Sequence, residues 1–519
     1  MPVPNRRGSA LAALCMAAFV ISSDTTIVNV ALPSLVHQLH ASTTDLQWVV
    51  DAYSLVFTAL ILAAGSLSDR LGRKGTLTVG LGLFGAASLA GSLGTTVHEL
   101  VAARAVMGLG AALIFPATLS LISNIFTGRA ERARAIGLWG ATTGVGIALG
   151  PIVGGWLLGR FWWGSVFLFM APVAAGIAAL VLTVVPPSRD PATPPVDWRG
   201  LVLSALGMGA LVFAIIEAPE VGWASARTIA SFAASVVVLA GFVVVERRRA
   251  DPMVDTELFA NPRFTAASGA VTVAFFALSG FIFLVTQYFQ FLKTYSPLAT
   301  GVRLLPVASS VAAASLVGTR LAVRVGNKQV VTAGLVLLGV AFGWIATTSA
   351  ATSYLLITAQ MLVLGTGMGL TSAPATEAIM GVVPTEKAGV GSAVNDATRL
   401  LGGTLGVAVI GSVAASVYAA RLGAALPAGL PGGVRETARG SVGGAIIAAQ
   451  QLPAAGLRPV AEQLRLAAVQ AFERSFSVGC LVAVAAAAAG AALAWVLLPA
   501  RPAAAVAAEP MASAQEGSQ

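Results

Sequence analysis

The chain has 519 residues, of which 57% are hydrophobic and only 10% are charged, and its mean hydropathy is +0.85. Soluble globular domains do not carry so apolar a composition, so water is not the main solvent of this chain. The net charge of +9 does not indicate nucleic-acid binding, because the basic residues lie in connectors between apolar stretches rather than together on one water-soluble face.

Apolar stretches near or above the roughly 20 residues that cross a bilayer recur along the whole chain. The first follows Arg6 and Arg7 and continues to Pro33 without a convincing cleavage site, so we expect a retained first span rather than a signal peptide. The pattern predicts an all-α polytopic membrane protein. Its fourteen expected spans are 10–33, 46–66, 75–95, 99–122, 134–157, 163–185, 200–217, 227–245, 265–290, 303–322, 329–347, 353–376, 390–417 and 476–498.

The distribution of Lys and Arg predicts the orientation of these spans. Of the 31 Lys and Arg residues, the short outer loops hold only Arg160, Arg227, Lys293 and Arg303, whereas most of the others lie in inner connectors. Cytoplasmic loops generally carry the excess of basic residues. We therefore expect a multi-pass protein of the inner (cytoplasmic) membrane with both termini in the cytoplasm.

The spans fall into groups of six, two and six. Residues 10–185 are expected to form an N-terminal six-helix bundle and residues 263–498 a C-terminal one, with two linker helices and their cytoplasmic connectors at 186–262. The other expected segments are a cytoplasmic N-terminus at 1–9, a long outer loop at about 418–475 with a short amphipathic helix near 460–475, and a disordered cytoplasmic tail at 499–519.

Two groups of six spans indicate an internal repeat. The sequence carries one trace of it, a pair of inner loops that read GSLSDRLGRK at 65–74 and TRLAVRVGNK at 319–328. Chance similarity between two basic loops explains this match equally well.

The first of these loops combines turn-permitting glycines, one carboxylate and three cations. Its residues of interest are Gly65, Asp69, Arg70, Gly72, Arg73 and Lys74. A loop made basic only for topology would not need both glycines and an aspartate at this spacing. The loop resembles the inner-loop signature of the major facilitator superfamily, G-x-L-x-D-R-x-G-R-K. The resemblance implies the major facilitator fold, two six-helix bundles, here with two extra transmembrane helices. It also implies a conformational latch in which Asp69 and Arg73 tie the two halves together in one state.

The fourth span contains Arg104, which costs at least about 3 kcal/mol inside a membrane unless it is paired. A static buried ion pair would explain it. The superfamily resemblance implies instead that Arg104 takes part in proton coupling. Met107 departs from the glutamine that is common in the superfamily at that position.

The fifth span carries glycines at four-residue spacing around a proline. These residues are Gly140, Gly144, Gly146, Gly150, Pro151, Gly154 and Gly155. Close helix packing alone would explain the glycines, and the proline bends the span. The set resembles the antiporter signature of drug exporters in the superfamily, which implies export rather than uptake.

Further matches, spread over most of positions 20–412, resemble the 14-span drug:proton antiporter family. They lie at Asp24–Pro33, Trp48–Leu55, Phe161–Leu168, Gln287–Tyr288, Ser296–Leu298, Arg303–Pro306 and Ala388–Asp396. Two residues depart from the pattern of the family. Met170 stands where relatives usually have asparagine, and Leu400 stands where many have glutamate.

Asp24 lies past the middle of the first span, where burial disfavours the charged carboxylate, so we expect it to carry the coupling proton together with Arg104 and Asp51. Asp51 and Glu217 lie near the outer ends of their spans, where a carboxylate can also simply face water. The residues expected to contact substrate are Asp24, Asp51, Tyr53, Phe57, Glu217, Phe283, Gln287 and Tyr288. An aromatic residue on a span can equally face lipid or a neighbouring helix.

Together these features predict a proton-coupled antiporter that exports lipophilic, often cationic, drugs by alternating access. A dedicated exporter of one endogenous natural product is the alternative. A membrane-embedded enzyme is a remote one, because no catalytic motif was found and His37, His40 and His98 lack metal-ligand spacing. We expect neither a cofactor nor a metal, and protons are the expected coupling ion. The expected partners are small lipophilic substrates and the lipid bilayer, with no nucleic acid, and the protein is expected to function as a monomer.

Overall fold

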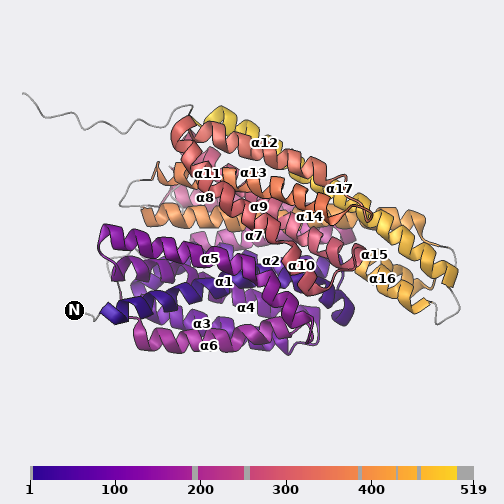
Figure 1. The fold of residues 1–519 in the computed structure, drawn as a ribbon, viewed down its shortest axis with the longest axis horizontal. Helices are drawn as coiled ribbons and strands as arrows, with labels where there is room; N and C mark the ends of the chain where they lie inside the picture. Colours follow the sequence, from indigo (N-terminus) through magenta and orange to yellow (C-terminus); the bar gives the residue numbers. More distant parts are fainter. Residues whose placement is uncertain are drawn as a thin grey trace, which may run out of the picture.

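The computed structural model describes residues 4–189, 197–249, 258–383, 388–427, 430–452 and 458–499. This part of the chain is helical throughout, without strands (Figure 1). The predicted tail lies outside it beyond residue 499. The helices are α1 (Pro4–Leu39), α2 (Thr43–Leu71), α3 (Arg73–Ser92), α4 (Val97–Ile125), α5 (Arg129–Leu158), α6 (Ser165–Val184), α7 (Trp198–Val221), α8 (Ala226–Arg247), η1 (Leu258–Ala260), α9 (Pro262–Gln287), η2 (Tyr288–Leu292), α10 (Pro297–Arg303), α11 (Leu305–Val325), α12 (Asn327–Ile345), α13 (Tyr354–Met380), α14 (Ala388–Ala425), α15 (Gly432–Gly440), α16 (Val442–Gln451) and α17 (Arg458–Leu497).

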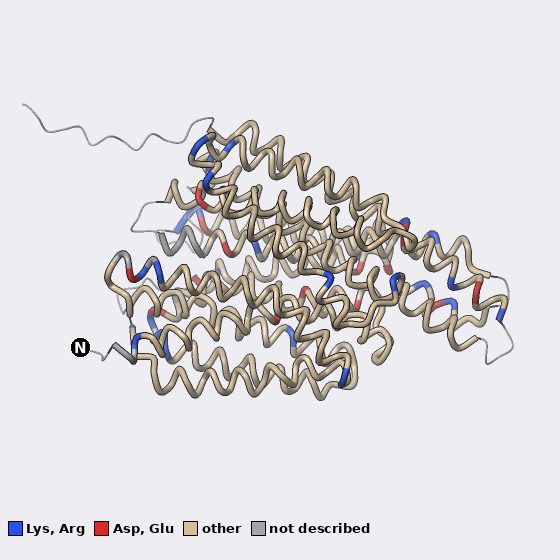
Figure 2. The backbone as a smooth tube through the Cα atoms, in the orientation of Figure 1, with Lys and Arg blue, Asp and Glu red and all other residues tan. Residues whose placement is uncertain are grey.

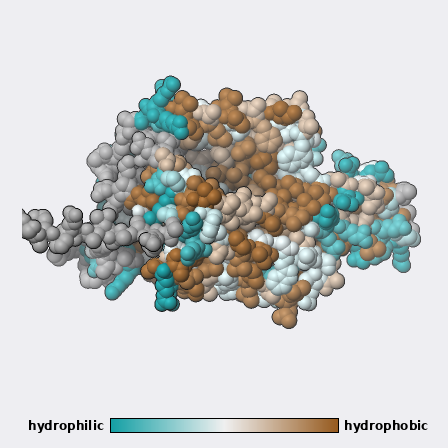
Figure 3. All heavy atoms as spheres, turned by 90° about the horizontal axis from the view of Figure 1, so that it is seen from above, coloured by the Kyte–Doolittle hydropathy of each residue, from teal (hydrophilic) through white to brown (hydrophobic). Residues whose placement is uncertain are grey.

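The number of helices that can cross a membrane agrees with the expected number of spans. Thirteen helical segments of the described chain are long and apolar enough to do so. The two arms of α2, which meet at an angle of 58° between Ile61 and Ala63, count together as a fourteenth. Most charged residues lie toward the ends of the long helices, and few lie along their middle (Figure 2). The surface between those ends is largely apolar (Figure 3), as the hydrocarbon core of a bilayer requires.

The helices repeat one packing order. In the first set α1 lies along α5, α2 along α4, and α3 along both α4 and α6. In the second set α9 lies along α14, α11 along α13, and α12 along both α13 and α17. We refer to α1–α6 as the N-terminal half and to α9–α14 with α17 as the C-terminal half; they lie side by side (Figure 1).

The two similar inner loops occupy equivalent places in the two halves. Gly72 joins α2 to α3 with φ +123°, and Gly326 joins α11 to α12 with φ +95°. Each glycine is the eighth residue of its matched stretch, 65–74 or 319–328. Both adopt a backbone conformation that other residues avoid, which explains why the glycine persists where the aspartate and one arginine do not.

The helices α7 and α8 form a hairpin at the seam between the halves. α7 packs on both α2 and α14, and α8 packs on α7. The inner end of the hairpin is tied by Asp197, which caps α7 through the backbone N–H of Gly200 and pairs with Arg249 at 2.6 Å. Through α7, the hairpin therefore contacts both halves.

The segment expected to be a long outer loop is mostly helical. α14 continues to Ala425, α15 and α16 follow, and α17 begins at Arg458. The expected short helix near 460–475 is therefore the first part of α17 and not a separate element. These helices extend past the rest of the bundle at one end (Figure 1). The sequence did not reveal these helices, because a composition rich in Ala and Gly lacks the apolar pattern by which a span is recognised.

We expect replacement of Gly326 by alanine to lower the stability of the protein, because its positive φ disfavours a side chain by about 1–3 kcal/mol. Gly343→Ala is the matched control, since Gly343 lies within α12 and a Cβ there meets nothing within 4 Å. Thermal unfolding in detergent measures both. Equal unfolding midpoints for the two variants would contradict the assignment of Gly326 as a conformationally required glycine.

Candidate functional site

A buried ion pair lies at the centre of the N-terminal half. Arg104 Nη1 of α4 is 2.6 Å from Asp24 Oδ2 of α1, and the two side chains are only 1% and 0% exposed. Arg104 Nε also donates to the carbonyl oxygen of Val49 in α2, at 3.0 Å, and its guanidinium lies 4.3 Å from the centre of the Tyr53 ring. One arginine thus joins three helices, and the cost of burying its charge is offset by a carboxylate, a carbonyl and an aromatic face.

The sequence around Arg104 allows this approach. One turn farther along α4, a Cβ on Gly108 would overlap the backbone of Tyr53. Gly110, on the opposite side of α4, packs in the same manner on Gly80 and Phe84 of α3. The glycines therefore let α2 and α3 close on α4, and this contact brings Val49 and Tyr53 within reach of the arginine.

Asp51 is the second predicted coupling residue, and its environment differs. It is fully buried, and neither of its carboxylate oxygens has a hydrogen-bond partner in the described chain. It lies on α2 one turn after Gln47, which donates to the Val407 and Ala408 carbonyls of α14. Asp51 therefore lies near the boundary between the two halves, and a charged carboxylate without partners is costly there.

The glycines of α5 divide between two faces. Gly146, Gly150 and Gly154 press on α1, where an added Cβ on Gly150 would lie 2.7 Å from the Ser23 carbonyl oxygen and would overlap the Thr26 hydroxyl. Pro151 cannot donate to the carbonyl of Ile147, and the Thr26 hydroxyl donates to that carbonyl at 3.1 Å instead. The carbonyl that Pro151 leaves without its helical donor is thus satisfied by α1, two residues from Asp24.

The other face of α5 meets the C-terminal half at one end only. A Cβ on Gly155 would lie 2.5 Å from the Pro297 carbonyl oxygen of α10. Gly144 and Gly140 continue the same face toward the inner end, and a Cβ on either would meet no described atom within 4 Å. The halves therefore touch at Gly155, at the predicted outer end of α5, whereas Gly144 and Gly140 toward its predicted inner end are uncovered.

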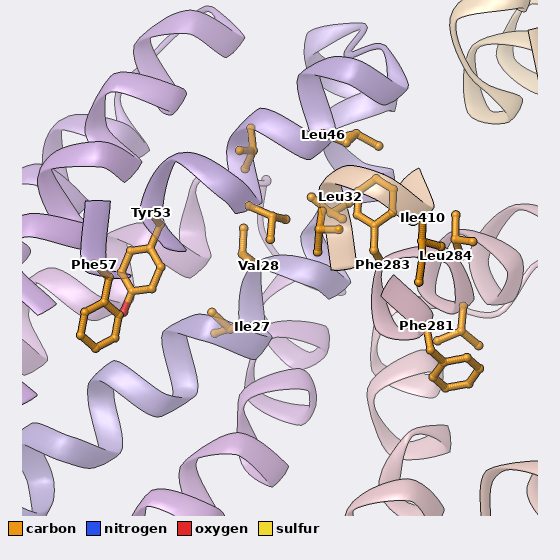
Figure 4. Close-up of a cluster of buried hydrophobic side chains, with 14 of the residues drawn as sticks. Ile27, Val28, Leu32, Leu46, Tyr53, Phe57, Phe281, Phe283, Leu284 and Ile410 are labelled. Carbon is orange, nitrogen blue, oxygen red and sulfur yellow. The ribbon is translucent and has the colours of Figure 1, made fainter. Parts of the chain in front are cut away.

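Hydrogen bonds that join the N-terminal half to the C-terminal half and to α15 also lie at the predicted outer end. Gln290, which follows α9, donates to the Val30 carbonyl of α1, and Thr43 at the start of α2 donates to the Gly440 carbonyl. α1 also packs on α9, and Leu32 of α1 and Phe283 of α9 belong to one cluster of buried hydrophobic side chains (Figure 4). The two halves are thus in contact at the end of the bundle that the distribution of Lys and Arg predicts to be the outer one.

The predicted latch residues at the inner side pair within the N-terminal half. Arg73 Nε lies 2.5 Å from Asp69 Oδ1, and Arg73 Nη1 donates to the Ser188 hydroxyl after α6. Lys74 donates to the Leu182 carbonyl, and the Arg70 carbonyl accepts from Arg189. Gly65 lies near Pro116 of α4. Within the described chain, the recorded hydrogen bonds and ion pairs of Asp69 and Arg73 do not reach the C-terminal half.

The residues expected to contact substrate fall into separate groups and do not form one site. Tyr53 and Phe57 form an edge-to-face pair in the N-terminal half (Figure 4), and Phe57 continues it to Phe115. Glu217 of α7 accepts a hydrogen bond from the Trp48 indole at 3.2 Å.

In the C-terminal half, Phe283 lies against Gly411 of α14, and Gln287 donates to the Phe283 carbonyl of its own helix. The Tyr288 hydroxyl donates to the Ser349 carbonyl, and its ring stacks on Phe476. Both Gln287 and Tyr288 are therefore held by contacts inside their own half.

Sequence reasoning missed three groups that connect the site to its surroundings. The Thr26 hydroxyl donates to the carbonyl that Pro151 leaves without its helical donor. Gln47 joins α2 to α14, and Trp139 of α5 packs on Phe115 with ring centres 5.0 Å apart. Of these three, only the Thr26 contact was indicated by the sequence, because a proline within a helix leaves the carbonyl four residues earlier without its donor.

Comparison with known proteins agrees with this architecture. The family model of the Major Facilitator Superfamily matches residues 14–407. The multidrug efflux pump LfrA of Mycolicibacterium smegmatis is 37% identical over 464 residues, which cover 89% of this chain and 92% of the pump. The multidrug resistance protein Stp of Mycobacterium tuberculosis is 36% identical over 395 residues, covering 76% of this chain and 73% of Stp.

Among solved structures, an inward-facing, unoccupied bacterial homologue of the human lysosomal transporter Spinster superposes with a TM-score of 0.67, at 16% identity over 95% of this chain and 98% of the other. At 16% identity, this similarity shows the fold alone. The family match over most of the chain, the close relatives and the repeated packing of two helical halves lead to one conclusion. The chain belongs to the major facilitator superfamily and is a multi-pass membrane transporter.

Proposed function

We propose that this transporter exports lipophilic compounds in exchange for protons. The observation that carries the proposal is the Asp24–Arg104 ion pair, buried among α1, α2 and α4. Protonation of Asp24 removes the negative charge that holds Arg104 to α1, while Arg104 keeps its contacts with Val49 and Tyr53 of α2. A proton therefore changes the contact between helices inside the half.

Contacts of α1 with α5 transmit this change to the boundary between the halves. Ser23 and Thr26 of α1, which flank Asp24, donate to the Gly146 and Ile147 carbonyls of α5. The opposite face of α5 carries the outer contact at Gly155. A shift of α1 relative to α4 therefore alters the position of α5, and with it the closure of the outer side.

In this proposal, access alternates between the two ends of the α5 face that carries Gly155, Gly144 and Gly140. In the present state Gly155 is covered and Gly144 and Gly140 are uncovered. In the opposite state we expect the C-terminal half to approach the uncovered glycines and to leave Gly155. The Asp69–Arg73 pair of the inner loop would then exchange partners with the C-terminal half, as the superfamily resemblance implies.

The nature of the cargo is inferred from the relatives and from Asp51. LfrA and Stp are named for multidrug efflux and multidrug resistance, which supports a broad range of lipophilic cargo. A carboxylate without partners near the boundary of the halves supports a preference for cationic compounds once water or cargo reaches it. Protons are the coupling ion, both termini are cytoplasmic, and the monomer is the transporting unit in this proposal.

Replacement of Asp24 by asparagine tests the coupling. We expect Asp24→Asn to lower proton-driven dye uptake into inverted vesicles by at least about tenfold, because asparagine cannot exchange a proton. Glu131→Gln is the control, since Glu131 is an exposed carboxylate at the start of α5. Unfolding midpoints in detergent confirm that both variants fold. Undiminished coupled uptake in Asp24→Asn would remove this residue from the mechanism.

A panel of dyes that differ in charge tests the cargo range. We expect uptake of permanently cationic dyes to fall about tenfold more than uptake of neutral dyes when Asp51 is replaced by asparagine, because only the cations gain from the carboxylate. Equal losses for both dye classes would contradict a cation preference that rests on Asp51. Failure of the natural protein to move any dye of the panel would favour the alternative of a dedicated exporter.

A further inference from the structure

A short helix, α10, lies between the ninth span and the main helix of the tenth span, α11. α10 covers only Pro297–Arg303, and α11 starts two residues later at Leu305. Pro306 has no N–H to donate to the preceding turn, and the break is bridged by bonds of the shorter i to i+3 type, from Leu304 N to Gly301 O and from Val307 N to Leu304 O. Such a break is a natural place for the chain to bend.

α10 makes the close contact with the N-terminal half at the outer side. Its Gly301 abuts Pro151 of α5, where any Cβ would overlap the Pro151 carbonyl oxygen. Gly155 of α5 in turn abuts Pro297 and Leu298. Two glycines, one on each helix, thus allow the two backbones to touch.

Within its own half, α10 is held by an arginine between two tyrosines. The Arg303 guanidinium carbon lies 4.1 Å from the centre of the Tyr295 ring and 5.1 Å from that of Tyr354. Arg303 Nη1 donates to the Ala299 carbonyl, and the Tyr354 hydroxyl donates to the Arg303 carbonyl. Tyr295 precedes α10, Arg303 ends it, and Tyr354 begins α13, so this clamp fixes α10 relative to α13.

The segment that precedes α10 is also fixed. Lys293 Nζ donates to the carbonyls of Ala350 and Thr352, in the turn before α13. The Ala350 N–H donates to Glu473 of α17. The chain on the entry side of α10 is therefore anchored to the C-terminal half, which leaves the clamp and the break at Leu304 to determine how α10 lies on α5.

We propose that α10 is a hinged arm that closes the outer gate, and that Arg303 is the residue that positions it. The gate first opens when α10 leaves Gly155 and Pro151 of α5 by bending at Leu304–Pro306, while the body of α11 keeps its distance to α5. The movement of the whole half that alternating access requires is a separate step that follows. The inference rests on the proposed alternating-access function but concerns the gate alone, so it does not depend on which compound or ion is carried.

Spin-label distances test the hinge. In a background with the buried Cys15 and Cys480 replaced by serine or alanine, one label pair joins Trp156 of α5 to Leu298 of α10, and a second joins Trp156 to Val317 of α11. All three labelled side chains are exposed. We expect Arg303→Ala to shift the first distance to larger values and to leave the second unchanged.

The conservative variant and a matched control separate positioning from simple destabilisation. Arg303→Lys keeps a cation over the rings and should restore part of the native distance distribution, whereas Arg227→Ala removes an outer arginine that stacks on Phe213 and should change neither distance. Labelling of Leu298→Cys by a membrane-impermeant thiol reagent from the outer side should rise about tenfold in Arg303→Ala.

Three results would overturn the proposal. If both distances lengthened together, the gate would open by movement of the whole half and not by a hinge at α10. If neither changed, Arg303 would have no role in positioning. If Arg227→Ala lengthened the first distance as Arg303→Ala did, the effect would follow from the loss of any outer arginine and not from the clamp at α10. Undiminished coupled uptake in Asp24→Asn, together with the distances expected here, would refute the proposed function and leave the hinge intact.

Discussion

The structure depends on the requirement that a guanidinium in a membrane bundle must be paired. Arg104 meets that requirement with Asp24 on one side and with the Val49 carbonyl and Tyr53 ring on the other. An arginine left without its carboxylate at this depth would be strongly unfavourable, so the relative positions of α1, α2 and α4 follow from one side chain. The same dependence makes these positions sensitive to a single proton on Asp24.

The helix that carries Asp24, α1, also supplies a hydrogen bond to α5 next to Pro151. Thr26 supplies the hydrogen bond that Pro151 withholds from Ile147, and glycines let the two backbones approach. α5 faces the helix that carries Asp24 with one side and α10 of the other half with the opposite side. A continuous set of contacts therefore runs from Asp24 to the outer gate, and each contact is a direct packing or hydrogen-bond contact.

Much of this arrangement was predictable from particular residues. Gly72 and Gly326 marked equivalent loops, Arg104 required a partner, and the glycines of the fifth span indicated close helix contact; the structure places each of them accordingly. The partner of Arg104 lies 80 positions away in the chain and could not be chosen from spacing. The direction of Tyr288 on its span was equally open, because an apolar helix face does not reveal whether it meets a neighbour, lipid or cargo. The helices of 432–451 lacked the periodicity by which a span is recognised.

The account makes Asp24 the group that exchanges the coupling proton, and proton release on cargo binding measures this directly. In a weakly buffered detergent solution of the purified protein, addition of a transported dye should release protons, and the release should vanish in Asp24→Asn while dye binding persists. Dye binding without proton release in the natural protein, or unchanged release in Asp24→Asn, would contradict the account.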